Sequence, residues 1–95
     1  MKLMITFRNM DASDAIKDYI KQKISRVKKF APEPLEAFVV LSMQKHNHIC
    51  DISIQSGGKS FKGSESSENL YSSIDLVIEK LQRQMRDSKK RNSRV

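Results

Sequence analysis

The sequence predicts an α+β protein in which two parallel helices pack on one face of a four-stranded mixed sheet. Apolar residues alternate with polar ones in four short segments, which is the period of a strand, and they recur every three or four residues in two longer segments, which is the period of a helix. These segments follow one another in the order β-α-β-β-β-α. The chain has 95 residues, so we expect one domain whose thin core supports one sheet and one layer of helices.

The first strand and the first helix are predicted within residues 2–30. Leu3, Ile5 and Phe7 share one face of a strand over residues 2–7. Ser13 is a suitable N-cap, and the apolar residues after it recur at helical spacing: Ile16, Tyr19, Ile20, Ile24 and Val27. We expect this helix to end near residue 30, because the prolines at 32 and 34 lack an amide hydrogen and restrict the residue before them.

The middle of the chain predicts three further strands joined by hairpins. Alternating apolar residues indicate strands over residues 37–45 and 50–55. The glycine pair at 57–58 supplies the positive backbone dihedral angles of a hairpin turn, after which a strand is expected over residues 60–64. These hairpins make the second strand antiparallel to the third, and the third antiparallel to the fourth.

The last element is a helix that we expect to open near Ser66 or Ser67, with Glu68 in its first turn. Its apolar residues recur at spacings of three and four: Leu70, Ile74, Val77, Ile78, Leu81 and Met85. The apolar pattern then stops. We therefore expect a single domain over residues 1–86, followed by a basic tail over residues 87–95 that is frayed or disordered.

The order of the elements predicts where the helix ends lie. A helix between the first two strands makes those strands parallel, through a right-handed connection. Both helices then run in the same direction, side by side on one face of the sheet. We therefore expect their C-terminal ends to lie together at one end of the domain.

Basic residues gather at those two helix ends, and the chain has a net charge of +7. Residues 80–95 hold one acid, Asp87, against seven bases: Lys80, Arg83, Arg86, Lys89, Lys90, Arg91 and Arg94. Residues 21–29 contain no acid and five bases: Lys21, Lys23, Arg26, Lys28 and Lys29. The helix dipole favours only one or two cations at each C-terminus. The excess therefore predicts an interface for a polyanion, and nucleic acid fits best.

The reactive side chains do not predict a catalytic or metal site. His46, His48 and Cys50 share one strand face, but a structural zinc site needs four ligands and no second ligand pair is present. Cys50 continues the apolar face of its strand, where a thiol is inert. We expect no catalytic residue, no metal, no cofactor and no enzyme activity, with a Cys50 nucleophile as the weakest alternative.

The composition also bears on location. Apolar runs are far shorter than the roughly 20 residues of a membrane span, and residues 1–10 lack the apolar core of a signal peptide. A lone cysteine suits a reducing compartment. We therefore expect a cytoplasmic protein that binds no membrane.

Two stretches on the second helix resemble a known signature. Residues 70–75 (LYSSID) and 80–85 (KLQRQM) are similar to the motif of the ribosome hibernation-promoting and ribosome-associated inhibitor family, also called sigma-54 modulation proteins. The resemblance spans essentially the whole chain, because four more stretches share it: residues 4–6, 15–16, 39–41 and 57–58.

The resemblance implies the same β-α-β-β-β-α layout, which is similar to a double-stranded RNA-binding domain with an added first strand. It implies a non-enzymatic factor that binds the small ribosomal subunit and its rRNA where messenger and transfer RNA would sit. Such a factor inhibits translation and stabilises inactive ribosomes in stationary phase or stress. The chain resembles a short form, which implies a separate ribosome-dimerising factor as a further partner and a monomer off the ribosome. The residues leave one alternative open, a constitutive double-stranded-RNA-binding or ribosomal protein without an inhibitory role.

The candidate rRNA-binding residues come from the resemblance and from charge. The family's basic positions, carried over one at a time, fall on seven residues: Lys17, Lys23, Arg26, Lys29, Lys80, Arg83 and Arg86. Charge alone adds three more from the tail: Lys89, Lys90 and Arg91. We expect these side chains to hold phosphates, which positions the protein without reading base sequence.

Overall fold

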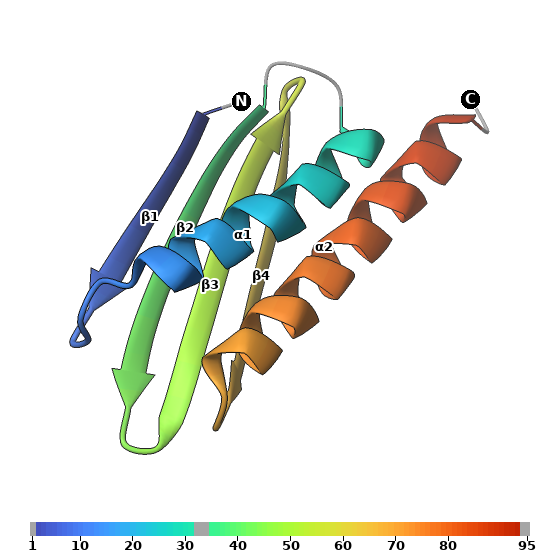
Figure 1. Cartoon of the computed structure of the whole chain (residues 1–95). Coiled ribbons are helices and arrows are strands. Elements are labelled where there is room, and N and C mark those ends of the chain that lie inside the picture. Colours follow the sequence, from blue (N-terminus) through green and yellow to red (C-terminus); the bar gives the residue numbers. More distant parts are fainter. Residues whose placement is uncertain (1, 32–34, 94–95) are drawn as a thin grey trace.

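The computed structural model describes residues 2–31 and 35–93, and its elements follow the predicted order. Four strands form one sheet in the order β1-β2-β3-β4: β1 (Lys2–Arg8), β2 (Leu35–Gln44), β3 (Asn47–Ser56) and β4 (Lys59–Ser67). Two helices cover one face of it, α1 (Asp14–Val27), which a short 3-10 helix η1 (Lys28–Phe30) extends, and α2 (Leu70–Ser93) (Figure 1). Strand β1 is parallel to β2, and the other two pairs are antiparallel, so the predicted fold class is confirmed.

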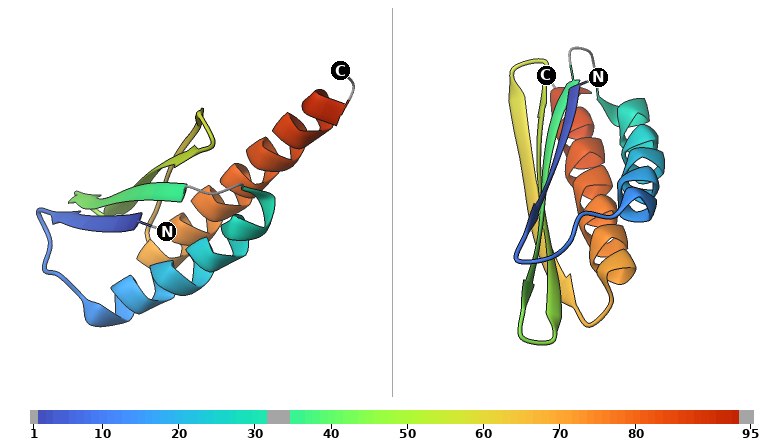
Figure 2. Two further views of the ribbon diagram at one scale, coloured as in Figure 1. Left: turned by 90° about the horizontal axis from the view of Figure 1, so that it is seen from above. Right: turned by 60° about the vertical axis from the view of Figure 1, so that its left-hand side comes forward.

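Figure 2 shows the sheet and the helices as two layers, and the core is a single layer of side chains between them. Strand register aligns Ile5, Val39, Ile52 and Gly63 across the sheet, on the face turned toward the helices. The helices add the residues whose spacing predicted them: Ile16, Ile20, Ile24, Val27, Leu70, Ile74, Val77, Ile78, Leu81 and Met85. Helical spacing predicted that these residues are buried, because burial of apolar side chains is the largest favourable term in folding.

The local signals around α1 behave as predicted. The side-chain oxygen of Ser13 accepts a hydrogen bond from the Ile16 N–H at 3.3 Å and so caps the helix. The chain leaves the helical conformation at Ala31, whose N–H donates to the carbonyl of Lys28 at 3.2 Å. The predicted end near residue 30 is therefore confirmed, while the prolines that predicted it lie outside the described residues.

The β3–β4 hairpin turns at Gly57 and Gly58, with φ angles of 54° and 83°. Glycine occupies this region without the steric cost that other residues meet. Strand β4 is longer than predicted, since its pairing with β3 continues to Ser67, which lies opposite His48.

The predicted start of α2 is wrong. The helix begins at Leu70, and Asn69 caps it through its Oδ1 atom, which accepts the Tyr71 N–H at 2.9 Å. Ser66 and Ser67 belong to β4, so no acid lies in the first turn of the helix. A serine before an acid suits an N-cap, but the backbone hydrogen bonds of the strand ladder extended β4 through both serines.

Both helices run in the same direction, and α2 continues beyond the end of α1 (Figures 1 and 2). Tyr19 and Lys23, in the middle of α1, already contact Tyr71 and Asp75 in the first turns of α2. The boundary predicted at residue 86 falls inside α2, which runs to Ser93. The division into a domain over 1–86 and a tail over 87–95 stays a prediction.

Candidate nucleic-acid interface

The basic residues of α1 lie on two sides of that helix. Lys23 and Arg26 follow Tyr19 along the side that faces α2, because positions three and four apart share a helix face. Lys17, one turn before Lys21, lies on the other side of the buried stripe. Arg26 and Lys29 are exposed, whereas Lys17 and Lys23 are half-buried.

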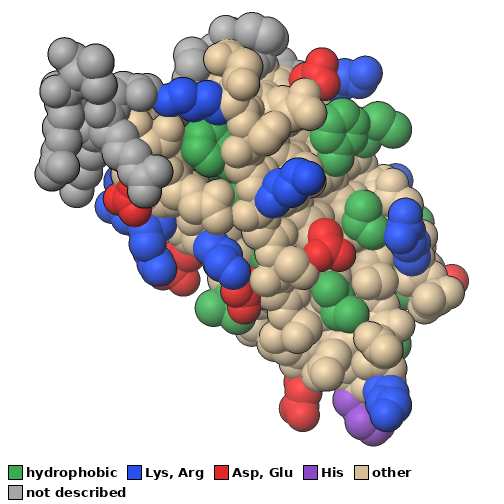
Figure 3. All heavy atoms as spheres, turned by 180° about the vertical axis from the view of Figure 1, so that it is seen from behind, with side chains coloured by type: hydrophobic (Ala, Val, Ile, Leu, Met, Phe, Trp, Pro, Cys, Tyr) green, Lys and Arg blue, Asp and Glu red, His purple; other side chains and the backbone are tan. Residues whose placement is uncertain are grey.

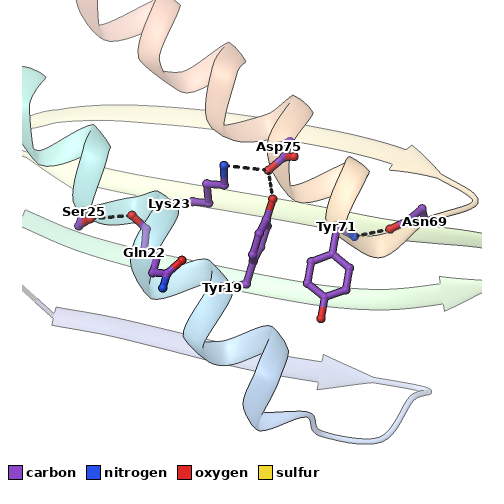
Figure 4. Close-up of polar contacts among 7 residues, drawn as sticks. All are labelled: Tyr19, Gln22, Lys23, Ser25, Asn69, Tyr71 and Asp75. Carbon is purple, nitrogen blue, oxygen red and sulfur yellow. Dashed lines mark hydrogen bonds and ion pairs between the residues drawn. The ribbon is translucent and has the colours of Figure 1, made fainter.

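The seam between the two helices is centred on Asp75 (Figure 4). The Tyr19 hydroxyl donates to Asp75 Oδ1 at 2.6 Å, and the Lys23 ammonium lies 3.5 Å from the same oxygen. The Lys23 ammonium also lies 5.2 Å from the centroid of the Tyr19 ring, within range of a cation–π interaction. The rings of Tyr19 and Tyr71 meet edge to face at 4.8 Å.

The contacts of this seam give Lys23 a structural role in addition to its predicted role in binding. The hydrogen bond to Asp75 raises the pKa of the Tyr19 hydroxyl, while the positive charge of Arg26 opposes that rise. Lys23 keeps only 20% of its side chain exposed beside this carboxylate. Its first role is therefore to join the two helices, a role that the sequence reasoning missed because Asp75 is far away in the chain.

The predicted cations of α2 are all exposed as far as the structure describes them. Lys80, Arg83 and Arg86 project from the helix, and Lys80 forms an ion pair at 3.1 Å with Glu65 of β4. Among the residues whose side chains are described, neither arginine has a carboxylate within ion-pair distance. The side chains of the other three predicted residues, Lys89, Lys90 and Arg91, lie outside the described part of the chain.

Polar contacts hold α2 along β4 and so orient its basic residues. Gln84 Nε2 donates to the carbonyl oxygen of Lys62 at 2.9 Å. One turn later, Lys59 Nζ donates to Ser88 Oγ at 2.9 Å. These contacts fix the rotation of the helix about its axis. Arg83 and Arg86 consequently point to solvent, since Gln84 and Met85 point to the sheet.

The structure therefore brings the two basic helix segments to the same end of the helix layer, as the topology predicted (Figure 1). It does not bring all of the predicted side chains into one free patch. Lys17 lies away from α2, and both Lys23 and Lys80 already have a carboxylate partner. Among the predicted residues whose side chains are described, the cations without a carboxylate partner near the helix ends are Arg26, Lys29, Arg83 and Arg86.

The opposite face of the sheet has a different character. Figure 3 shows basic, acidic and hydrophobic side chains interspersed on it, without a dominant charge. Met4 is 51% exposed in its edge strand. The charge of the helix side is therefore better suited to a polyanion.

Cys50 and His48, which were considered as reactive residues, have environments that suit a structural role. Cys50 is fully buried, and this burial raises the pKa of its thiol to about 12, with a smaller contribution from Asp51. His48 belongs to β3, and its carbonyl accepts the Ser73 hydroxyl at 2.7 Å. Within residues 2–31 and 35–93, no three His, Cys, Asp or Glu side chains are grouped to hold a metal ion. No helix in these ranges has the length and apolarity to span a bilayer.

The fold and its basic helices define a class of small β-α-β-β-β-α proteins with one cationic helix layer. The chain belongs to the family described as sigma 54 modulation protein / S30EA ribosomal protein, which matches residues 3–93. The predicted family resemblance is confirmed.

Relatives and solved structures agree with this assignment. The chain is 35% identical to the ribosome hibernation promotion factor of Picosynechococcus sp. over 97% of its length, and it spans about half, 51%, of that relative. It is 28% identical to the ribosome hibernation promoting factor of Salmonella typhimurium, with 90% of each chain covered. The N-terminal domain of Thermus thermophilus Protein Y superposes with a TM-score of 0.84 at 29% identity, covering 90% of this chain and 96% of that one. A Coxiella burnetii ribosomal subunit interface protein shares the fold, with a TM-score of 0.82 at 21% identity over 95% of this chain and 99% of that one.

Proposed function

We propose that this protein is a non-enzymatic ribosome hibernation factor. It binds the small ribosomal subunit where messenger and transfer RNA are decoded, inhibits translation and stabilises inactive ribosomes in stationary phase or stress. Family membership over residues 3–93 and the names of the relatives support the hibernation role. The observation that carries the binding mode is the arrival of two basic helix segments at the same end of one helix layer.

The proposed mechanism is electrostatic occupancy. Lysine and arginine side chains displace the cations condensed on RNA phosphates, and the release of those cations drives association. Arg83 and Arg86 are exposed, have no carboxylate partner among the described residues and are suited to two-pronged contacts with phosphate oxygens. Such contacts fix the position of the protein without reading base sequence, so the shape of the rRNA provides specificity.

The proposal also assigns the rRNA-binding residues, the location of the protein and its partner. The rRNA-binding residues are the ten predicted ones, with Lys23 and Lys80 acting in competition with their carboxylate partners. The protein is cytoplasmic and monomeric away from the ribosome, and a separate factor pairs ribosomes.

A salt titration of binding to purified small subunits tests the interface. Replacing Lys80, Arg83 and Arg86 by glutamine should lower affinity and flatten the slope of log K against log salt by about 0.7–0.9 for each lost contact. A matched control replaces three exposed cations away from the helices, Lys2, Arg8 and Lys45, and so removes the same charge. Equal losses in the two variants would contradict a specific interface on the helices.

Co-sedimentation separates hibernation from constitutive binding. A factor that occupies the decoding region binds idle ribosomes and is excluded when transfer RNA fills that region. A constitutive RNA-binding or ribosomal protein sediments equally with idle and translating ribosomes, and that result would refute the inhibitory role.

A further inference from the structure

Lys80 differs from Arg83 and Arg86, the other cations of α2 whose side chains are described, because it has a carboxylate partner. Its ammonium lies 3.1 Å from Glu65 Oε2, and the side chains are 47% and 32% exposed. Glu65 lies opposite Cys50 in the sheet, so it occupies the helix-facing side of β4. The ion pair therefore joins the outer edge of the helix layer to the sheet.

The lysine stem is also in contact with the sheet. A Cβ atom built on Gly63 would lie 3.6 Å from Lys80 Cδ and 3.4 Å from Val77 Cγ1. Gly63 leaves room for little more than a methyl group, so α2 lies close to β4 and the lysine stem lies across the strand. Lys80 is thus held along the sheet at its stem by packing and at its ammonium by Glu65.

We propose that Glu65 is an internal counterion that competes with RNA phosphates for Lys80 and thereby limits the affinity of the basic helix face. This inference rests on the proposed function, because the competing ligand is the phosphate backbone of rRNA. Glu65 occupies the position that a phosphate oxygen would take beside the ammonium. It contacts no RNA itself, so it determines affinity through Lys80.

The competition has a thermodynamic signature. If Lys80 stays with Glu65, this lysine releases no cation from the RNA. If Lys80 moves to a phosphate, the freed carboxylate attracts a cation from solution, which cancels one of those released. In both cases the wild-type salt slope lacks about one contact, and neutralising Glu65 restores it.

The experiment compares Glu65→Gln with Glu79→Gln in binding to purified small subunits across a salt titration. Glu79 is the sequence neighbour of Lys80, is exposed and has no ion-pair partner among the described residues. The Glu79→Gln substitution therefore removes the same charge as Glu65→Gln without freeing a lysine. Relative to this control, Glu65→Gln should bind about two- to fivefold more tightly at low salt and steepen the slope by about 0.7–0.9. In a Lys80→Met background the difference between the two variants should vanish.

A second measurement does not depend on the folding of the Glu65 variant. Lys80→Met should lower affinity less than Arg83→Met, because Lys80 starts with a carboxylate partner and Arg83 has none among the described residues. Equal affinity and slope for the two glutamine variants would overturn the role of Glu65, as would a larger loss for Lys80→Met than for Arg83→Met. Wild-type protein that shows no salt-dependent binding would overturn the proposed function, and this inference with it.

Discussion

The buried thiol of Cys50 should make the free energy of unfolding depend on pH in the alkaline range. In the unfolded chain this thiol has the ordinary pKa of 9.0, whereas burial in the folded protein raises its pKa to about 12. Between pH 9 and pH 12, therefore, the thiol is mostly protonated in the folded state and mostly deprotonated in the unfolded state. Stability from this group is complete below pH 9 and falls as the pH rises toward 12.

The expected loss follows from the difference between the two pKa values. At pH 10 most unfolded chains carry a thiolate and nearly all folded ones do not, which lowers the free energy of unfolding by about 1.4 kcal/mol. At pH 8 the folded protein has about a thousandfold less thiolate than an exposed cysteine has. Alkylation at neutral pH therefore proceeds through opening of the fold.

Urea unfolding of wild type and Cys50→Ala between pH 8 and pH 10 measures this effect. The alanine variant loses some stability at every pH, but it lacks the thiol-dependent decrease, so the curves should converge as the pH rises. Ser64→Cys in the Cys50→Ala background is the reactive control, since Ser64 is exposed on β4. Parallel pH curves, or alkylation of wild type as fast as this control, would refute the buried, inert thiol and reopen a nucleophilic role.

Two other predictions concern the contacts that hold the helices. Tyr19→Phe removes the hydroxyl that donates to Asp75, so it should lower the free energy of unfolding by about 0.5–1 kcal/mol in urea titrations at pH 7. Because the pKa of Tyr19 is raised, that difference should persist up to pH 10 and decline above it, and a difference that grows above pH 10 would contradict the assignment. Gly63→Ala should be stabilising by about 0.5–1 kcal/mol, since its Cβ meets only ordinary contacts, whereas Gly63→Leu should cost about 1–3 kcal/mol by pushing α2 outward. Equal melting temperatures for the two Gly63 variants would show that α2 does not approach β4 closely there.

The architecture was predictable from the sequence because local patterns and burial agree along this chain. Ile16, Ile20 and Ile24 recur at helical spacing, and all three are buried in α1. Strand alternation likewise placed Ile52 and Ile54 in the core. The start of α2 was not predictable, because Ser67 satisfies the preferences of a helix cap and of a strand end equally well.

The candidate site was predictable in its charge but not in its pairing. The run of basic residues that includes Arg83 and Arg86 predicted an exposed cationic helix face, and both side chains are exposed. The partners of Lys23 and Lys80 depend on tertiary packing. Glu65 and Lys80 are 15 residues apart on different elements, and only the packing of α2 on β4 brings their charges together. A net charge counts such cations in full, whereas the structure shows which of them already have a partner.

The position of α2 after all four strands has a consequence for biosynthesis. It supplies six of the seventeen buried apolar residues in the described chain, and Met85 is the last of them. A nascent chain thus has all four strands made while their apolar face still lacks its main cover. Native structure can form only after residue 85 has left the exit tunnel, and until then the apolar face of the sheet is available to chaperones.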